Sequence, residues 1–275
     1  MTPACQSFPA ETPAAGAGLQ LPATPAQAPA RSQALAERIE RYWTRRSAGF
    51  GQVRRSEIAG DKWEAWRGEI LPWLPKPREG RKLAVLDVGT GPGFFAVLLA
   101  CETGCEATGI DLSEGMLREA RALARETGCQ ARFLHMDAEA LDFDDGTFDA
   151  VLVRNLTWTL QRPAQAYREW CRVLRPGGVL LNFDADYGAV DFTEIAKAEG
   201  AHAHAGIAQD LLQEGEDIRR LLPLSAEPRP QWDVQALARA GFASVALDQD
   251  LSSRVFRVRD DAYNPVPMFA LRAVK

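Results

Sequence analysis

The sequence has little that would mark a membrane, metal-binding or nucleic-acid-binding protein. No apolar stretch reaches the length of a transmembrane helix, and no basic region followed by an apolar core opens the chain, so neither a membrane span nor secretion is expected. Of only three histidines, His202 and His204 form a pair without further ligands, so no metal site is expected. The formal net charge of −5 disfavours a nucleic-acid partner, which would select a basic surface.

Cysteine is also scarce, with five residues that lack the spacing of zinc ligands. We expect Cys101 and Cys105 to be small packing residues, because free cysteine is readily buried. This usage fits a reducing, cytoplasmic compartment. A chain of 275 residues can bury one full hydrophobic core with appendages, and its oligomeric state stays open.

Composition and hydrophobic periodicity divide the chain into three parts. Residues 1–30 are rich in Pro, Ala, Gln and Thr, so we expect a disordered tail. Residues 31–78 carry two helical patterns separated by a break at residues 47–51, and would form a lid segment. Residues 79–275 form the main domain. Its insertion at about 189–230 is expected to shape a binding pocket.

The most informative feature of the sequence is a cluster of glycines at one predicted turn. The segment Val85–Gly93 reads VLDVGTGPG and is followed by an apolar run to Ala100. This pattern predicts a buried strand that turns through three glycines into a helix. Backbone N–H groups at the start of that helix can bind a ligand directly, since no Cβ blocks the approach.

The spacing at this turn separates two kinds of ligand. A dinucleotide fingerprint is G-x-G-x-x-G, but its third glycine position holds Phe94 here. Asp87 precedes the first glycine, where a carboxylate would repel a pyrophosphate and would suit a cationic ligand. S-adenosylmethionine carries an ammonium and a sulfonium and no phosphate. A nicotinamide-dependent reductase is therefore disfavoured, and a glycine turn without a ligand is the plainest alternative.

Further strands are predicted downstream, and two of them are followed by an acid. Asp111 ends the second strand, where a carboxylate can accept both ribose hydroxyls of either cofactor, and Asp137 follows the third. Strands at 148–153 and 179–183 come next, with a helix between them. This order predicts an α/β fold with a doubly wound parallel sheet, whose ligands bind at the carboxyl ends of the strands. Strands at 242–247 and 267–274 would close the sheet as an antiparallel pair.

The region from Val85 to Phe183 resembles the core of class I S-adenosylmethionine-dependent methyltransferases, typified by those of ubiquinone and menaquinone biosynthesis. The resemblance implies a Rossmann-like, seven-stranded, mostly parallel sheet, with N-terminal helices and a helical insertion after the fifth strand. It also implies S-adenosyl-L-methionine as cofactor and a small molecule as acceptor. The matching segments are Leu86–Gly93, Gly109–Ser113, Asp137–Leu141, Phe148–Asp149 and Arg172–Gly178.

The motifs and the resemblance together indicate cofactor-binding residues, with Asp111 on the ribose and Asp137 near the adenine amino group. The full set is Asp87, Gly89, Thr90, Gly91, Gly93, Asp111, Leu112, Met116, Asp137, Ala138 and Arg154. The segment Arg154–Trp158 departs from the histidine-rich or apolar segment of many relatives, so quinone specificity is not carried over.

Substrate-side residues are expected on the lid segment and after the fourth and fifth strands. Tyr42, Arg46, Asn155 and Trp158 are candidates for binding the acceptor. The alternatives are that the aromatics pack helices and that the local arginines form a solvated face, although one or two could meet an anionic substrate.

Methyl transfer needs a base only when the nucleophile is protonated. Asp184, Asp186 and Tyr187 are candidates for that role, and loop capping is the alternative for the two acids. A second function remains open: a non-catalytic S-adenosylmethionine-binding regulatory or partner protein. An exposed apolar patch on the insertion would favour it, whereas a lid over the pocket would favour an enzyme.

Overall fold

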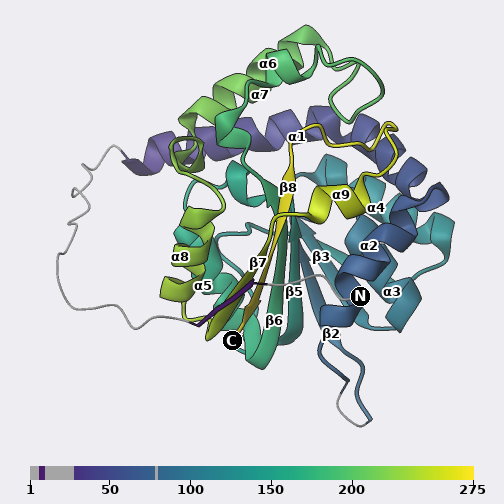
Figure 1. The fold of residues 1–275 in the computed structure, drawn as a ribbon, viewed down its shortest axis with the longest axis vertical. Coiled ribbons are helices and arrows are strands. Elements are labelled where there is room, and N and C mark those ends of the chain that lie inside the picture. Colours follow the sequence, from purple (N-terminus) through teal and green to yellow (C-terminus); the bar gives the residue numbers. More distant parts are fainter. Residues whose placement is uncertain (1–5, 10–27, 78–79) are drawn as a thin grey trace.

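A twisted sheet forms the centre of the molecule in the computed structural model, which describes residues 6–9, 28–77 and 80–275 (Figure 1). The strand order is β7-β8-β6-β5-β2-β3-β4, with β2 to β6 parallel and β8 antiparallel to both of its neighbours. This is the predicted doubly wound, mostly parallel sheet. The strands are β2 (Ala84–Val88), β3 (Glu106–Asp111), β4 (Ala131–His135), β5 (Phe148–Arg154), β6 (Leu174–Ala185), β7 (Ser244–Asp248) and β8 (Met268–Val274).

One further strand lies at an edge of this sheet. β1 (Gln6–Pro9) pairs antiparallel with β7, which makes the sheet eight-stranded. The pairing covers backbone groups that an edge strand would otherwise expose. For these four residues the prediction of disorder is wrong, and most of the rest of the predicted tail lies outside the described residues.

Helices cover both faces of the sheet (Figure 1). The faces carry separate hydrophobic clusters, one built around Trp66 and Phe95 and the other around Tyr167 and Trp170. Strand β2 is buried from both sides, which explains its continuous apolar sequence. The first face carries α2 (Lys62–Ile70), α3 (Phe94–Thr103), α4 (Glu114–Thr127) and α9 (Leu251–Val255), and the second carries α5 (Pro163–Val173) and α8 (Gln231–Ala240).

The N-terminal helix α1 (Ala28–Ala59) is continuous over 32 residues, so the predicted break at residues 47–51 is wrong. The small residues there serve a close contact between α1 and α4 instead of a chain reversal. At Gly115 of α4, a Cβ would lie 2.9 Å from Ser47 Oγ and 3.1 Å from the Cα of Thr44. Gly51 of α1 faces Glu119 of α4 in the same way. Tertiary packing therefore overrides the local helix-breaking tendency of glycine.

Helix α1 crosses the molecule near the carboxyl ends of the strands, and the insertion lies beyond it (Figure 1). Helix α7 (Gln209–Leu221) packs on α1, where Arg38 Nε and Nη2 each donate to Glu214 at 2.7 Å. The remaining short elements are η1 (Leu71–Trp73), η2 (Thr157–Thr159), η3 (Tyr187–Ala189), α6 (Phe192–Ile195) and η4 (Pro223–Ala226).

The cysteines divide into bonded and free ones. Cys101, at the end of α3, forms a disulfide with Cys129 after α4, with the two Cα atoms 5.5 Å apart. The expectation that Cys101 is a packing residue is therefore wrong, because the sequence does not show that these two helix ends meet. Cys105 is a buried free thiol, as expected. The bond gives no support to the predicted reducing compartment.

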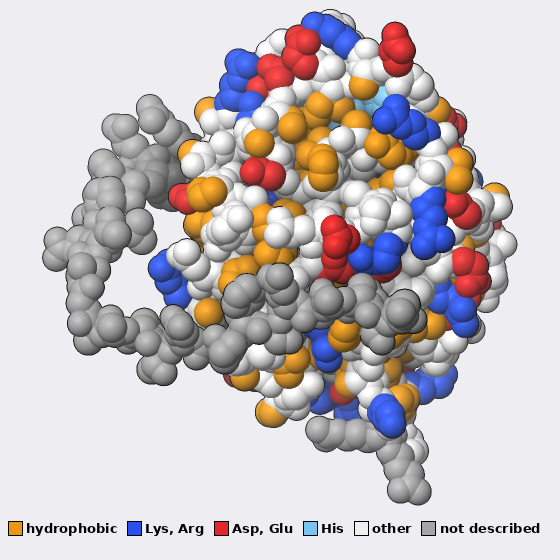
Figure 2. All heavy atoms as spheres, viewed as in Figure 1, with side chains coloured by type: hydrophobic (Ala, Val, Ile, Leu, Met, Phe, Trp, Pro, Cys, Tyr) orange, Lys and Arg blue, Asp and Glu red, His pale blue; other side chains and the backbone are white. Residues whose placement is uncertain are grey.

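No helix within the described residues is both long and apolar enough to cross a membrane. On the face drawn in Figure 2, acidic and basic side chains are interspersed between apolar ones. Where grey atoms do not cover this face, its basic side chains do not gather into one extended patch.

Candidate functional site

A cavity of about 520 Å³ lies between α1 and the carboxyl ends of the strands, which is within the usual range for small-molecule sites. One part, which we call the cofactor half, is lined by the turn after β2, the end of β3 and the loop after β4. The other part, the acceptor chamber, is lined by Trp43, Trp158, Tyr187, Ala203, His204 and Asn264.

The turn after β2 has the conformation that its glycines allow. Gly89, Gly91 and Gly93 have φ angles of 63°, 53° and 86°, in the left-handed region. Gly91 lines the cavity, and a Cβ built there would meet no atom within 4 Å. A side chain at Gly91 would therefore occupy ligand space. Gly93 does not line the cavity, since its Cβ would point at Ala120 Cβ at 2.9 Å, so it serves the contact of α3 with α4.

The buried carboxylate of Asp87 stabilises this turn by accepting hydrogen bonds. Its Oδ2 accepts hydrogen bonds from Thr90 Oγ1 at 2.6 Å and from Ala96 N at 3.0 Å. Burial raises the pKa of Asp87 to about 7, against the lowering effect of these two donors. No described residue donates to Oδ1. A cationic group bound beside Asp87 would therefore stabilise the carboxylate that burial disfavours.

Asp111 joins the turn to the end of β3. Its Oδ2 accepts from Gly91 N and its Oδ1 from Ser113 N, both at 2.9 Å. Burial raises the pKa of Asp111 to about 6, although both N–H donors oppose the shift. Leu112 and Met116 line the cavity beside it.

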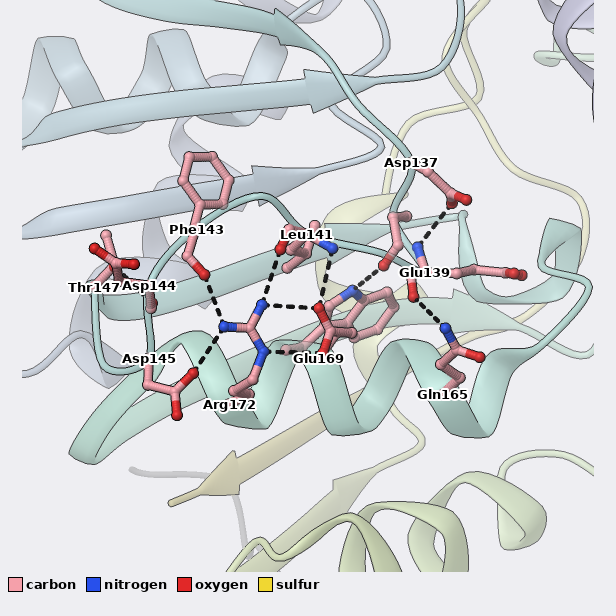
Figure 3. Close-up of polar contacts among 12 residues, drawn as sticks. Asp137, Glu139, Leu141, Phe143, Asp144, Asp145, Thr147, Gln165, Glu169 and Arg172 are labelled. Atoms are coloured by element: carbon pink, nitrogen blue, oxygen red, sulfur yellow. Dashed lines mark hydrogen bonds and ion pairs between the residues drawn. The ribbon is translucent and has the colours of Figure 1, made fainter.

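The loop after β4 brings Asp137 and Ala138 to the cavity, and α5 holds it there (Figure 3). Trp170 Nε1 donates to the carbonyl oxygen of Ala138 and Gln165 Nε2 to that of Glu139, both at 2.9 Å. Helix α5 therefore fixes the backbone at Ala138 and Glu139, beside the predicted adenine site.

Arg172 extends the same support along the loop (Figure 3). Its Nη2 donates to the Leu141 carbonyl at 2.9 Å and its Nη1 to the Phe143 carbonyl at 2.7 Å. Glu169 orients the guanidinium by accepting from Nε and Nη2. Arg172, the first residue of a segment that resembles the methyltransferase core, therefore supports the loop after β4 and does not itself line the cavity.

A buried group of charges borders the cavity between its two parts. Arg54 and Arg154 line the cavity and share one carboxylate, that of the fully buried Glu57. Arg154 donates to Glu57 at 2.7 and 3.1 Å and lies over the ring of Trp66 at 4.5 Å. Two guanidinium groups against one carboxylate leave this group, Arg54–Glu57–Arg154, with a net positive charge.

Aromatic rings form the walls of the acceptor chamber. Trp158 lies edge-on to Trp43 with ring centroids 6.1 Å apart, and its ring is 5.2 Å from that of Tyr187. Asn155, which follows β5 and precedes Trp158 in the same loop, has a φ of 54° and a buried Oδ1 without a hydrogen-bond partner among the described residues. Such a strained asparagine is typical of ligand sites.

Two polar side chains of the chamber have defined protonation. Tyr187 Oη accepts from Asn264 Nδ2 at 2.8 Å, and the Asn264 amide is oriented by Val266 N at 3.1 Å from its Oδ1. Burial raises the pKa of Tyr187, so its hydroxyl keeps its proton. Burial lowers the pKa of His204 to about 3, so this ring is neutral. The described residues contain no group of three or more potential metal ligands around it.

Four other predicted residues do not line the cavity. Tyr42 Oη accepts from Arg46 Nη1 at 2.8 Å, and this pair packs within the helical cover. Asp184 is fully buried and accepts from Arg229 Nη2 at 3.1 Å, so it faces a structural arginine. Asp186 is also absent from the lining. The acids are therefore misplaced for the role of base, and only Tyr187 of the three candidates reaches the cavity.

Comparison with known proteins gives the class of the fold. A structure of a SAM-dependent methyltransferase from Thermotoga maritima matches with a TM-score of 0.55 and 19% identity, over 86% of this chain and 99% of that one. A Haemonchus contortus phosphoethanolamine N-methyltransferase in complex with S-adenosyl-L-methionine matches with a TM-score of 0.54 and 18% identity, over 78% and 52%. Both share the fold of the present chain.

Sequence comparison identifies the family. The family described as "Methyltransferase domain" matches residues 86–182. A ubiquinone/menaquinone biosynthesis C-methyltransferase of Bradyrhizobium diazoefficiens is 35% identical over 203 residues, which are 68% of this chain and 77% of that protein. The chain therefore belongs to the S-adenosylmethionine-dependent methyltransferases that include these enzymes. A Roseobacter denitrificans relative is 40% identical, but over 118 residues, 42% of this chain and only 46% of that protein.

Sequence reasoning missed several residues of the cavity. Arg54 belongs to a run of arginines that already hinted at an anionic ligand, and His204 belongs to the only close histidine pair. Asn264 carries no sequence signal, because its role depends on where a long C-terminal loop lies. Glu57 could not be recognised either, since its partners Arg54 and Arg154 are brought together only by the fold.

Proposed function

We propose that this methyltransferase transfers the methyl group of S-adenosylmethionine to a small molecule bound in the acceptor chamber. The observation that carries the proposal is one continuous cavity with two chemically different parts. Its cofactor half presents backbone N–H groups and carboxylates, and its acceptor chamber presents aromatic rings. A cavity of about 520 Å³ is large enough for a cofactor together with a small acceptor.

The residues present fit the cofactor. The space beside Gly91 would be filled by any Cβ, so this part of the turn is shaped for close approach of a ligand. Asp87, with its pKa near 7, would hold the ammonium group, and Asp111 would accept the ribose hydroxyls. Asp137 and Ala138 would border the adenine, on the loop that α5 fixes. Arg154 remains a candidate for the cofactor's carboxylate.

When bound, the cofactor supplies an electrophilic methyl group whose leaving group is a neutral thioether, so no acid is required. The chain's contribution is to hold the nucleophile in line and to exclude water. Trp43 and Trp158, which contact each other edge to face, offer a continuous aromatic wall to an acceptor. Tyr187 keeps its proton and is therefore a hydrogen-bond donor rather than a base. The neutral ring of His204 can accept a hydrogen bond from a protonated acceptor.

The insertion favours this function over a non-catalytic binding protein. It contributes Ala203 and His204 to the cavity wall, and its helix α7 packs on α1. These are the features expected of a lid.

Methyl-labelled S-adenosylmethionine tests the proposal. The full chain is incubated with it and a cell extract that has been separated into small-molecule and macromolecular fractions. We expect label to enter the small-molecule fraction, and expect no transfer with Gly91→Val. Transfer confined to protein or nucleic acid would contradict the proposal, as would the absence of transfer to either fraction.

A further inference from the structure

The charges of the cavity are distributed unevenly along its length. The four acids of its lining, Asp87, Asp111, Asp137 and Glu139, all lie in the cofactor half. Glu139 is neutralised there by Arg162, whose Nε donates to it at 2.7 Å. Of these acids, Asp87 is the one placed to meet the cationic ammonium group of the cofactor.

Positive charge lies where the cofactor half meets the acceptor chamber. Arg54 and Arg154 share only the carboxylate of Glu57. Among the described residues, Arg54 donates hydrogen bonds to Glu57 alone, although its guanidinium carries several further N–H groups. Burying such excess positive charge is costly unless an anion joins it.

A neutral donor belongs to the same region. Tyr187 is only 4% exposed, and its oxygen already accepts from Asn264 Nδ2. The hydroxyl proton finds no acceptor among the described residues, and Tyr187 lines the cavity. Arg54, Arg154 and Tyr187 all line this cavity, and Arg54 and Arg154 are joined through Glu57. Arg54 and Tyr187 therefore each have a donor left for a ligand in the cavity.

From this arrangement we infer that the methyl acceptor is a small, flat, apolar molecule that carries a carboxylate. Its carboxylate binds between the Arg54 guanidinium and the Tyr187 hydroxyl, and its apolar body lies against Trp43 and Trp158. Guanidinium and phenol donors recognise carboxylate oxygens, and aromatic walls favour a flat body. The inference rests on the proposed function, because it assigns the substrate class of the same chamber.

Matched pairs of probes test this assignment on the full chain. S-adenosylhomocysteine is first titrated into the protein, and the saturated complex is then titrated with benzoate, phenylacetate and indole-3-acetate and with their primary amides. Each pair shares a ring and differs in charge. We expect at least one carboxylate to bind ten times or more as tightly as its amide. If no carboxylate binds more tightly than its amide, the inference is wrong.

Variants locate the recognition. Arg54→Gln and Tyr187→Phe are each expected to reduce the preference for the carboxylate at least fivefold, while changing the dissociation constant of S-adenosylhomocysteine less than twofold. Arg55→Gln is the matched control, because Arg55 points to Glu119 and Glu126 on α4 instead of the cavity. In Arg54→Gln the buried Glu57 carboxylate still has both hydrogen bonds from Arg154, so it stays paired.

Two results would overturn the assignment in different ways. If Arg54→Gln weakens S-adenosylhomocysteine tenfold but leaves 5′-methylthioadenosine unaffected, Arg54 holds the carboxylate of the cofactor and not that of the acceptor. If S-adenosylhomocysteine itself does not bind to the wild-type chain, the proposed function fails and this inference fails with it.

Discussion

Replacing Asp87 with asparagine tests whether this side chain binds the ammonium group of the cofactor. The variant keeps the turn, because an amide oxygen can accept from Thr90 Oγ1 and Ala96 N as the carboxylate does. It removes the charge, and it replaces the free acceptor Oδ1 by an amide nitrogen that donates. Losing a charge-assisted hydrogen bond costs about 1.5–3 kcal/mol, so S-adenosylhomocysteine should bind roughly ten- to a hundredfold more weakly at pH 7.5.

The pH dependence follows from the pKa of Asp87, which burial raises to about 7. Only the ionised form attracts an ammonium group, so affinity should fall as the pH drops through 7. About three-quarters of the Asp87 carboxyls are ionised at pH 7.5 and about one-tenth at pH 6. The amine of the ligand, with a pKa of about 8, is more fully protonated at pH 6, which offsets part of this loss of affinity. The wild-type dissociation constant should therefore rise roughly sixfold between these values.

The assay is calorimetric titration with two ligands at both pH values. 5′-Methylthioadenosine keeps the adenine and ribose but has no amino-acid part, so its affinity reports Asp111 and not Asp87. The ratio of the two affinities should depend on pH in the wild type and not in Asp87→Asn. If the substitution weakens both ligands equally, Asp87 only braces the turn, and the assignment of the ammonium site is refuted.

The same substitution should leave the fold at least as stable above pH 7. The folded-state pKa of Asp87 lies above its ordinary value, so this group's contribution to stability is fully present below about pH 4 and is lost as the pH rises through 7. An amide never pays this ionisation cost. A melting temperature of Asp87→Asn well below that of the wild type at pH 8.5 would show that the carboxylate has a structural role.

Three further predictions concern the cofactor half. Gly91→Val should abolish binding of S-adenosylhomocysteine in a folded protein. Gly128→Val changes another left-handed glycine, one that does not line the cavity, and should bind S-adenosylhomocysteine normally. If both variants lose binding, backbone strain and not the filling of the cavity causes the loss. Asp111→Ala should weaken S-adenosylhomocysteine by about 1–3 kcal/mol, and a calorimetric loss within error would contradict the ribose contact. Arg172→Met should lower the free energy of unfolding in urea by about 1–3 kcal/mol and weaken the binding of 5′-methylthioadenosine, because the loop after β4 loses two hydrogen-bond donors. If neither quantity changes, the other contacts of α5 are sufficient to hold the loop.

The cofactor half was predictable from sequence because its signals are local. A strand, three glycines and a helix follow one another within Val85–Ala100, and their order fixes the turn. Asp111 and Asp137 could be brought to the same cavity by a general property of parallel sheets, whose strands end at one edge. Ten of the eleven predicted cofactor residues line the cavity, and Gly93 differs only because its missing side chain faces Ala120.

The acceptor chamber was not predictable in this way, because it is built from distant segments. Asp184 has the sequence position of a base, but Arg229, 45 residues later, turns it into part of a buried ion pair. His204 and Asn264 reach the cavity through a long insertion and a C-terminal loop that have no strong periodicity. The continuity of α1 likewise depends on its contact with α4, which local propensity does not contain.

The central claim is that this cavity binds S-adenosylmethionine and not a dinucleotide. Parallel calorimetric titrations of the full chain with S-adenosylmethionine, S-adenosylhomocysteine and NAD test it most directly. The account predicts micromolar binding of the first two and none of NAD. Binding of NAD alone, or of none of the three, would contradict it.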